Sequence, residues 1–177
     1  MKIKVRKPNL EALNEQGIPR DYAQVMDYFN KGLAKSKYPY VARRVPITVQ
    51  EIKEKWIPSA KTNITLVAES EGQVVGSLTV FYDPKATDYE YASQRKLGDI
   101  GETADYSFNQ DEIKKSLITA LVTELRARSV QARFMAPVED PFLKVLEEIG
   151  YEAKISEGVE RYQKLGLSGK AKEYLLP

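Results

Sequence analysis

Two apolar runs separated by a short turn constrain the fold of this chain of 177 residues more than any other feature. Residues 64–69 read Ile-Thr-Leu-Val-Ala-Glu, and residues 73–82 read Gln-Val-Val-Gly-Ser-Leu-Thr-Val-Phe-Tyr. The turn sequence Ser70-Glu71-Gly72 lies between them. Apolar, β-branched runs bounded by turn residues indicate strands, and two such runs joined by a turn predict a β-hairpin. The sequence therefore predicts an antiparallel pair of strands in the middle of the chain.

Four other segments have the apolar period of amphipathic helices. They are residues 21–33, a segment that begins at Thr48, residues 110–128 and residues 142–149. Thr48 and Glu51 have the spacing of a capping box, in which each side chain bonds the backbone N–H of the other residue. Gly150 follows the fourth segment, at the position after a helix where glycine is favoured. Both features predict where a helix begins or ends.

Short strand patterns complete the predicted fold. They cover residues 2–7, 97–106, 131–136 and 159–165. Residues 83–96 are expected to form a polar loop. The order of elements predicts an α/β (α+β) fold, with a mixed, mostly antiparallel central sheet of about six to seven strands and helices on both faces. We expect a single domain over residues 1–166, followed by a C-terminal tail over residues 167–177.

The composition excludes several classes of chemistry. The chain contains no histidine and no cysteine, which excludes Ser-His and Cys-His nucleophilic catalysis, thiolate zinc sites and disulfides. Proton transfer must therefore use Asp, Glu, Lys or Tyr side chains, or water. Asp99, Glu102 and Asp105 lack the spacing of a calcium-binding loop, so no metal site is expected.

Charge and hydropathy limit the expected partners. Lys and Arg number 27 and Asp and Glu number 25, which gives a net charge of +2. The basic residues are spread along the chain, whereas binding to a phosphate backbone needs them clustered on one face. No apolar run reaches the roughly 18 residues of a membrane span, and the N-terminus lacks the apolar core of a signal peptide. We expect a cytoplasmic protein with neither a nucleic-acid nor a membrane partner.

Two segments resemble a known family. The run Val67 to Val80 (VAESEGQVVGSLTV) resembles the second and third strands of the GNAT superfamily of N-acetyltransferases, and Phe142 to Ala153 (FLKVLEEIGYEA) resembles its closing segment. The resemblance covers roughly residues 1–166. It implies the GNAT fold and transfer of acetyl from acetyl-CoA to the amine of a small molecule or peptide. A homodimer is a further partner that the sequence leaves open.

The resemblance also implies a cofactor-binding turn at the start of the helix over residues 110–128. In the family a Gln/Arg-x-x-Gly-x-Gly/Ala pattern lets backbone N–H groups hold the pyrophosphate at a helix N-terminus. Gln110 matches the first position, but Ile113 and Lys115 stand at the two glycine positions, and carboxylates follow Gln110 directly. Lys114 and Lys115 either offset those carboxylates or belong to a solvated helix face. The implied cofactor-binding set is Asp105, Ser107, Gln110, Ile113, Lys114, Lys115, Ser116 and Asp140.

The implied catalytic residues lie in the segment before that helix. By resemblance, Asp99 falls at the position of the family's general base, and Glu102 is an alternative on the opposite strand face. Asp99 also fits a carboxylate at a strand end that faces solvent. Leu146 stands where the family often has a tyrosine acid and is expected to be a core residue, so Tyr106 or Tyr151 would have to supply the proton.

Three functions therefore stay open. The first is an N-acetyltransferase that uses acetyl-CoA. The second is a catalytically inactive GNAT-fold module for binding or assembly, which the carboxylates and missing glycines of the turn favour. The third is an acyltransferase with a different acyl donor.

Overall fold

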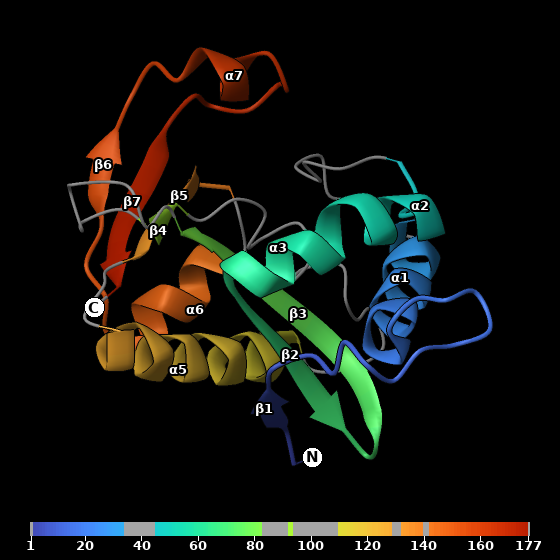
Figure 1. Ribbon diagram of the computed structural model, residues 1–177. Helices are drawn as coiled ribbons and strands as arrows, with labels where there is room; N and C mark the ends of the chain where they lie inside the picture. The colour runs from blue at the N-terminus through green and yellow to red at the C-terminus, as the bar shows by residue number, and fades with distance from the viewer. Residues whose placement is uncertain are drawn as a thin grey trace.

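The computed structural model describes residues 2–33, 45–82, 92–93, 110–128, 132–139 and 142–176. Its strands are β1 (Lys4–Arg6), β2 (Ile64–Ser70), β3 (Gln73–Tyr82), β4 (Ala92–Ser93), β5 (Ala132–Pro137), β6 (Lys154–Ser156) and β7 (Ala171–Leu176). Its helices are α1 (Arg20–Leu33), α2 (Val49–Glu51), the π-helical η1 (Ile52–Trp56), α3 (Ile57–Thr62), α5 (Gln110–Arg128), α6 (Phe142–Ile149) and α7 (Glu160–Gln163). Figure 1 shows these elements.

Within the described residues, the strands form one seven-stranded sheet in the order β1-β2-β3-β4-β5-β7-β6. The β4–β5 pair is parallel, and each other pair of neighbours in that order is antiparallel. The predicted mixed, mostly antiparallel sheet of about six to seven strands is therefore confirmed. Because β4 and β5 are parallel, the chain must cross over the sheet between them, and α5 makes that crossover.

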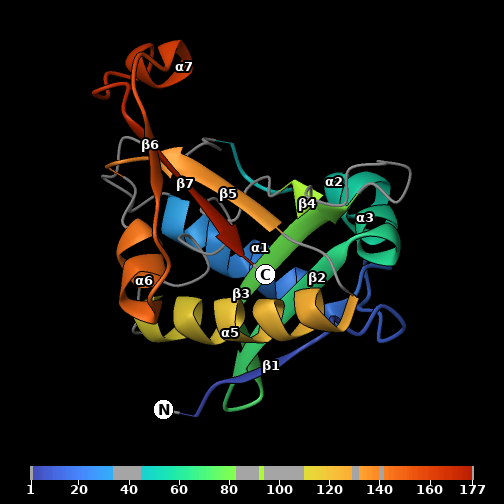
Figure 2. The ribbon, with the colours of Figure 1, turned by 90° about the vertical axis from the view of Figure 1, so that its left-hand side faces the viewer.

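The sheet is covered on both faces. Figure 2 shows α5 and α6 in front of the sheet and α1 behind it. Leu66 and Ala68 on β2 pack in the core cluster that includes α5, whereas Val67, between them in sequence, packs with Val25 of α1. Successive strand residues point to opposite faces, so a strand covered on both faces is apolar throughout. This burial explains why β2 is apolar from Leu66 to Ala68.

The turn between β2 and β3 follows from its two central residues. Glu71 has a φ of 51° and Gly72 a φ of 79°, and Ser70 pairs with Gln73 on either side of them. Two-residue hairpin turns in which both residues have positive φ match the right-handed twist of the strands. The predicted hairpin is confirmed, and Ser70 belongs to its first strand rather than to the turn.

The second predicted helix begins at the expected residue and then continues as a π-helix. The Thr48 hydroxyl caps α2 by accepting a hydrogen bond from the Glu51 N–H at 3.2 Å. In η1 the Ile57 N–H donates to the carbonyl of Ile52, five residues earlier. Pro58 accounts for this π turn, because it has no N–H and its ring would clash with the carbonyl four residues before it in an α-helix.

The ends of α5 and α6 coincide with the predicted residues. Helix α6 ends in a Schellman motif, in which the Gly150 N–H donates to the Glu147 carbonyl at 3.0 Å and the Tyr151 N–H to the Leu146 carbonyl at 3.1 Å. Gly150 has a φ of 108°, which a residue with a side chain rarely adopts. Leu146 is fully buried, so its predicted place in the core is confirmed.

The C-terminal part of the sheet differs from the prediction. The predicted strand over residues 159–165 is wrong, because residues 160–163 form α7 in the connection between β6 and β7 (Figure 1). The segment 167–177, expected to be a tail, supplies β7, which pairs with both β5 and β6. Ala92 and Ser93 form β4 within the predicted polar loop. The predicted strand over residues 97–106 lies outside the described residues.

Candidate functional site

The first turn of α5, beside α6, is the part of the predicted site that the structure describes. Gln110 is the first residue of α5, and Ile113, Lys114, Lys115 and Ser116 follow in its first turns. The other predicted site residues, Asp99, Glu102, Asp105, Tyr106, Ser107 and Asp140, lie outside the described residues. The geometry of the site is therefore the geometry of this helix end.

Ile113 belongs to the core. Its side chain is 1% exposed and packs in the cluster that holds α5 and α6 against the sheet. The position that matches a glycine of the family pattern therefore contributes apolar packing below the helix. The backbone N–H groups that lack a partner within the helix come before Ile113, in the first turn of α5.

Lys114 is also buried, with 1% of its surface exposed. Ile118 and Leu121, four and seven residues later, lie on the same side of α5 and are fully buried. The methylene groups of Lys114 therefore extend the apolar stripe of the helix toward its N-terminus. Lys114 is not part of a solvated helix face.

Lys115 points toward α6. Its Nζ lies 2.5 Å from Oε2 of Glu148, and the two side chains are 44% and 37% exposed. The Lys144 Nζ lies 3.7 Å from Oε1 of Glu148 and 3.9 Å from Oδ2 of Asp111. The four side chains form a row of alternating charges between α5 and α6. The hydrogen bond from Lys115 lowers the pKa of Glu148, and Lys144 adds to this effect. Glu148 therefore competes with any anion for the Lys115 ammonium group.

Ser116 uses its hydroxyl locally. The Ser116 Oγ donates to the Glu112 carbonyl four residues earlier, at 2.9 Å. This hydrogen bond is common for serine within a helix. It directs the hydroxyl hydrogen along the helix rather than toward a ligand at the N-terminus.

Sequence reasoning missed the contribution of α6. Glu148 and Lys144 are four residues apart on α6, a spacing that places them on one face of the helix. That spacing was visible in the sequence. Their contact with Lys115 and Asp111 was not, because it depends on how α6 packs against α5.

Comparison with known proteins gave matches only among solved structures. No family model matches the sequence, and no curated protein matches it. An N-acetyltransferase from Staphylococcus aureus Mu50 has a TM-score of 0.68 and 16% identity, over 99% of this chain and 98% of the other. An acetyltransferase of the GNAT family from Streptococcus pneumoniae has a TM-score of 0.65 and 12% identity, over 98% of each chain.

This chain has the GNAT fold. A third similar structure is a putative acetyltransferase from Salmonella typhimurium with its cofactor acetyl-CoA, with a TM-score of 0.66 and 14% identity over 98% of this chain and 92% of the other. The predicted resemblance is therefore confirmed at the level of the GNAT fold, over nearly the whole chain.

Within the described ranges, the GNAT-fold chain offers neither a metal site nor a membrane span. No group of three or more acidic side chains there could hold a metal ion. No described helix is both long enough and apolar enough to cross a bilayer.

Proposed function

We propose that the protein is an N-acetyltransferase that transfers acetyl from acetyl-CoA to an amine of a small molecule or peptide. The observation that carries this proposal is the similarity to acetyltransferases over nearly the whole chain, one of which contains acetyl-CoA. A fold can serve several functions, so the proposal also depends on whether the first turn of α5 suits the anionic part of acetyl-CoA.

Several features of this turn suit an anion. Helix α5 has 19 residues, and its first backbone N–H groups and the positive end of its dipole favour negative charge. The pyrophosphate of acetyl-CoA would bind at these amides, next to Gln110, which is the first residue of the helix. Because Lys115 is paired with Glu148, we expect the backbone amides to contribute more of the affinity than this side chain does.

The remaining residues supply proton transfer in this proposal. An amine attacks the carbonyl carbon of a thioester only after losing a proton, which the carboxylate of Asp99, or of Glu102, accepts. The new C–N bond forms as the C–S bond breaks, and Tyr106 donates its proton to the departing sulfur. Acetyl-CoA supplies the activated acetyl group, and the products are an amide and free CoA.

A second candidate function is a GNAT-fold binding module that does not use acetyl-CoA. The row of charges formed by Asp111, Lys144, Glu148 and Lys115 favours it, because two carboxylates and two ammonium groups already neutralise one another beside the helix end. Asp111 and Glu112 also stabilise the first turn themselves, by about 0.3–1 kcal/mol each. The negative charges of Asp111 and Glu112 would repel an entering pyrophosphate.

Calorimetric titration with acetyl-CoA separates the two candidates. The proposed enzyme binds with a Kd below about 100 μM, which corresponds to about −5.5 kcal/mol. The variant Asp99→Asn should retain this binding and lose acetylation of an amine-acceptor panel, while Glu15→Gln, an exposed residue in the segment before α1, should retain both. Absence of binding at millimolar acetyl-CoA would leave the binding module as the function.

A further inference from the structure

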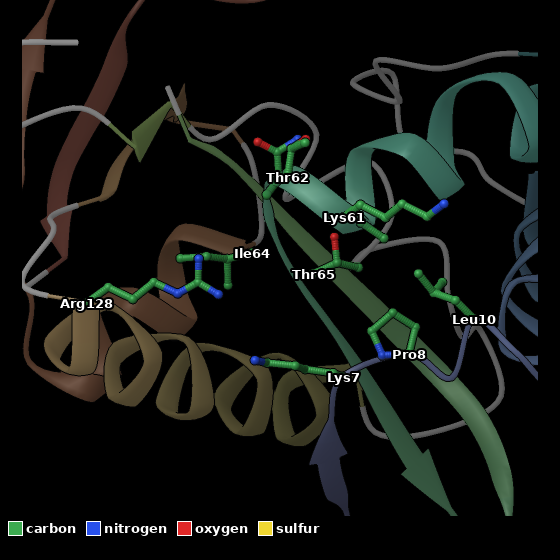
Figure 3. A pocket seen from close by; sticks show the side chains of 10 residues that line it. Lys7, Pro8, Leu10, Lys61, Thr62, Ile64, Thr65 and Arg128 are labelled. Carbon is green, nitrogen blue, oxygen red and sulfur yellow. The ribbon is translucent and has the colours of Figure 1, made fainter. Parts of the chain in front are cut away.

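A pocket at the far end of α5 plays no part in the proposed acetyl transfer. It has a volume of about 280 Å³ and lies between the chain that follows β1, the end of α3, the start of β2 and the last turn of α5 (Figure 3). Helix α5 has 19 residues, so at 1.5 Å per residue its two ends are about 27 Å apart. A ligand in this pocket would not occupy the place proposed for the pyrophosphate.

The charged residues that line this pocket are all basic: Lys7, Lys61 and Arg128. Arg128 forms an i,i+4 ion pair with Glu124, whose Oε2 lies 3.6 Å from the Arg128 Nε, so the charge of Arg128 is partly offset. Within the described part of the chain, the ammonium groups of Lys7 and Lys61 make no ion pair. The pocket therefore collects positive charge that the surrounding side chains neutralise only in part.

Two of the three basic side chains point toward each other. Figure 3 shows Lys7 and Arg128 extending from opposite sides toward the middle of the pocket, whereas Lys61 extends away from them along α3. An ammonium group and a guanidinium group that face one space form a binding site for an oxyanion, because the planar guanidinium donates two parallel hydrogen bonds and the ammonium adds a point charge.

Helix ends provide an alternative reason for two of these cations. Helices α3 and α5 both end at the pocket, and the carbonyl end of a helix carries a partial charge of roughly −0.5. Two such ends offset about one of the three positive charges. Lys7 follows a strand, so a helix dipole on its own element does not account for it. The net charge on the pocket remains positive.

The uncharged lining indicates what the anion is attached to. Pro8, Leu10, Ala60 and Ile64 supply apolar surface, whereas the Thr65 hydroxyl is already engaged by the Thr79 hydroxyl at 3.1 Å. The volume of about 280 Å³ lies just below the range for ligand pockets, roughly 300–1,000 Å³, so the pocket suits a small ligand. We propose that this pocket binds a small organic phosphate monoester, with its phosphate between Lys7 and Arg128 and its organic part against Ile64 and Pro8.

Titrations followed by amide NMR at constant ionic strength test this proposal. The probes are phenyl phosphate, inorganic phosphate and benzoate, added to the full chain. We expect phenyl phosphate to shift the amides of Thr62, Asn63 and Thr65 but not those of Ile113 and Lys115. Inorganic phosphate should bind more weakly at the same amides, because it lacks the apolar part, and benzoate more weakly again, because it carries a single charge.

Variants assign the binding to the two cations. Lys7→Ser with Arg128→Ser should weaken phenyl phosphate binding at least about tenfold, since two charged hydrogen-bond donors are lost. Lys61 lines the same pocket but extends away from its middle, so Lys61→Ser should weaken phenyl phosphate binding less than about threefold. The remote Lys164→Ser should leave this binding unchanged. The side chains of Lys7 and Arg128 are exposed, and either single variant replaces the double variant if that one does not fold.

Several results would overturn the proposal. One is the absence of any shift of the pocket amides at about 10 mM phenyl phosphate. Another is an unchanged affinity in the Lys7 and Arg128 variants. A third is an equal loss of affinity in Lys164→Ser, which would indicate general charge attraction. Equal affinity for benzoate would overturn the assignment to a phosphate monoester. Binding of acetyl-CoA at the first turn of α5 is measured separately, so either proposal can fail without the other.

Discussion

Arg6 is the residue that connects the most elements near the N-terminus. Its Nη1 and Nη2 lie 2.6 and 3.0 Å from the two carboxylate oxygens of Asp21, and its Nε lies 2.8 Å from Oε2 of Glu69. These contacts join β1, α1 and β2. The side chains of Arg6, Asp21 and Glu69 are 29%, 10% and 24% exposed, so water screens this network only in part.

Replacing Arg6 with methionine should destabilise the protein. The change keeps most of the apolar stem and leaves the nearly buried carboxylate of Asp21 without its charged partner, which we expect to cost about 2–4 kcal/mol. Chemical denaturation measures this loss. The control Lys4→Met removes an exposed cation from the same strand, and a similar loss in both variants would contradict the role assigned to the network.

Asp21 should also make stability depend on acid pH. Burial raises the pKa of Asp21, but hydrogen bonds from Arg6 and from the Asn9 N–H together lower it below its ordinary value. The stabilisation is therefore present above pH of about 4, the pKa of an unfolded aspartate. It is lost as the pH falls through the lower pKa of the folded state. Denaturation at several pH values should show a smaller acid dependence in Asp21→Asn, and an unchanged dependence would count against this cause.

At the scale of elements, the contact between α5 and α6 controls whether Lys115 can reach an anion. In Glu148→Gln the Lys115 ammonium group loses its carboxylate partner and becomes available at the first turn of α5. We expect the affinity for acetyl-CoA to rise about two- to fivefold, as for one partly exposed charge contact. Calorimetry measures it, with Glu15→Gln as the variant with the same change in charge. A fall in affinity would mean that Glu148 organises the site.

The end of α6 depends on a single backbone conformation. Gly150→Ala places a side chain at a φ of 108°, which should cost about 1–2 kcal/mol. No heavy atom lies within 4 Å of the added Cβ, so backbone strain rather than a clash causes the loss. Denaturation of this variant beside Glu152→Ala, an exposed neighbour, checks the prediction, and equal stability of the two variants would contradict it.

Elements with one clear pattern could be predicted from the sequence, including the strand over residues 131–136 that corresponds to β5, whereas β6 and β7 could not. Helix α5 shows its period plainly, and the hairpin shows its turn. Strand β7 buries Ala171 on one face and Tyr174 and Leu176 on the other, whereas Leu175 is 51% exposed, so its burial does not alternate. The segment has no clear period, so the sequence predicts a tail there. The site could be placed at the start of α5, but the ion pair of Lys115 with Glu148 depends on tertiary packing.

At the scale of the whole molecule, β7 joins the edge strand β6 to β5 and so holds this end of the sheet together. Tyr174→Ala should cost about 3–5 kcal/mol, because it removes a fully buried ring and leaves a cavity. It also removes the hydrogen bond of the Tyr174 hydroxyl to Oε1 of Glu147 at 3.1 Å. Leu175→Ala, on the same strand but 51% exposed, should cost less than about 1 kcal/mol. Thermal and chemical denaturation of the two variants measures the difference in stability. Equal losses of stability would contradict the role assigned to the buried side of β7.

The place of β7 between β5 and β6 has a consequence for how the protein is made. A ribosome delivers β5 and β6 before β7, yet β6 pairs with no other described strand and β5 has β7 as its partner on one side. Until β7 emerges, both strands present open backbone edges, the kind of surface through which nascent chains associate wrongly. The sheet is thus expected to be completed late in synthesis. We expect nascent chains that stall before residue 171 to depend most on chaperones.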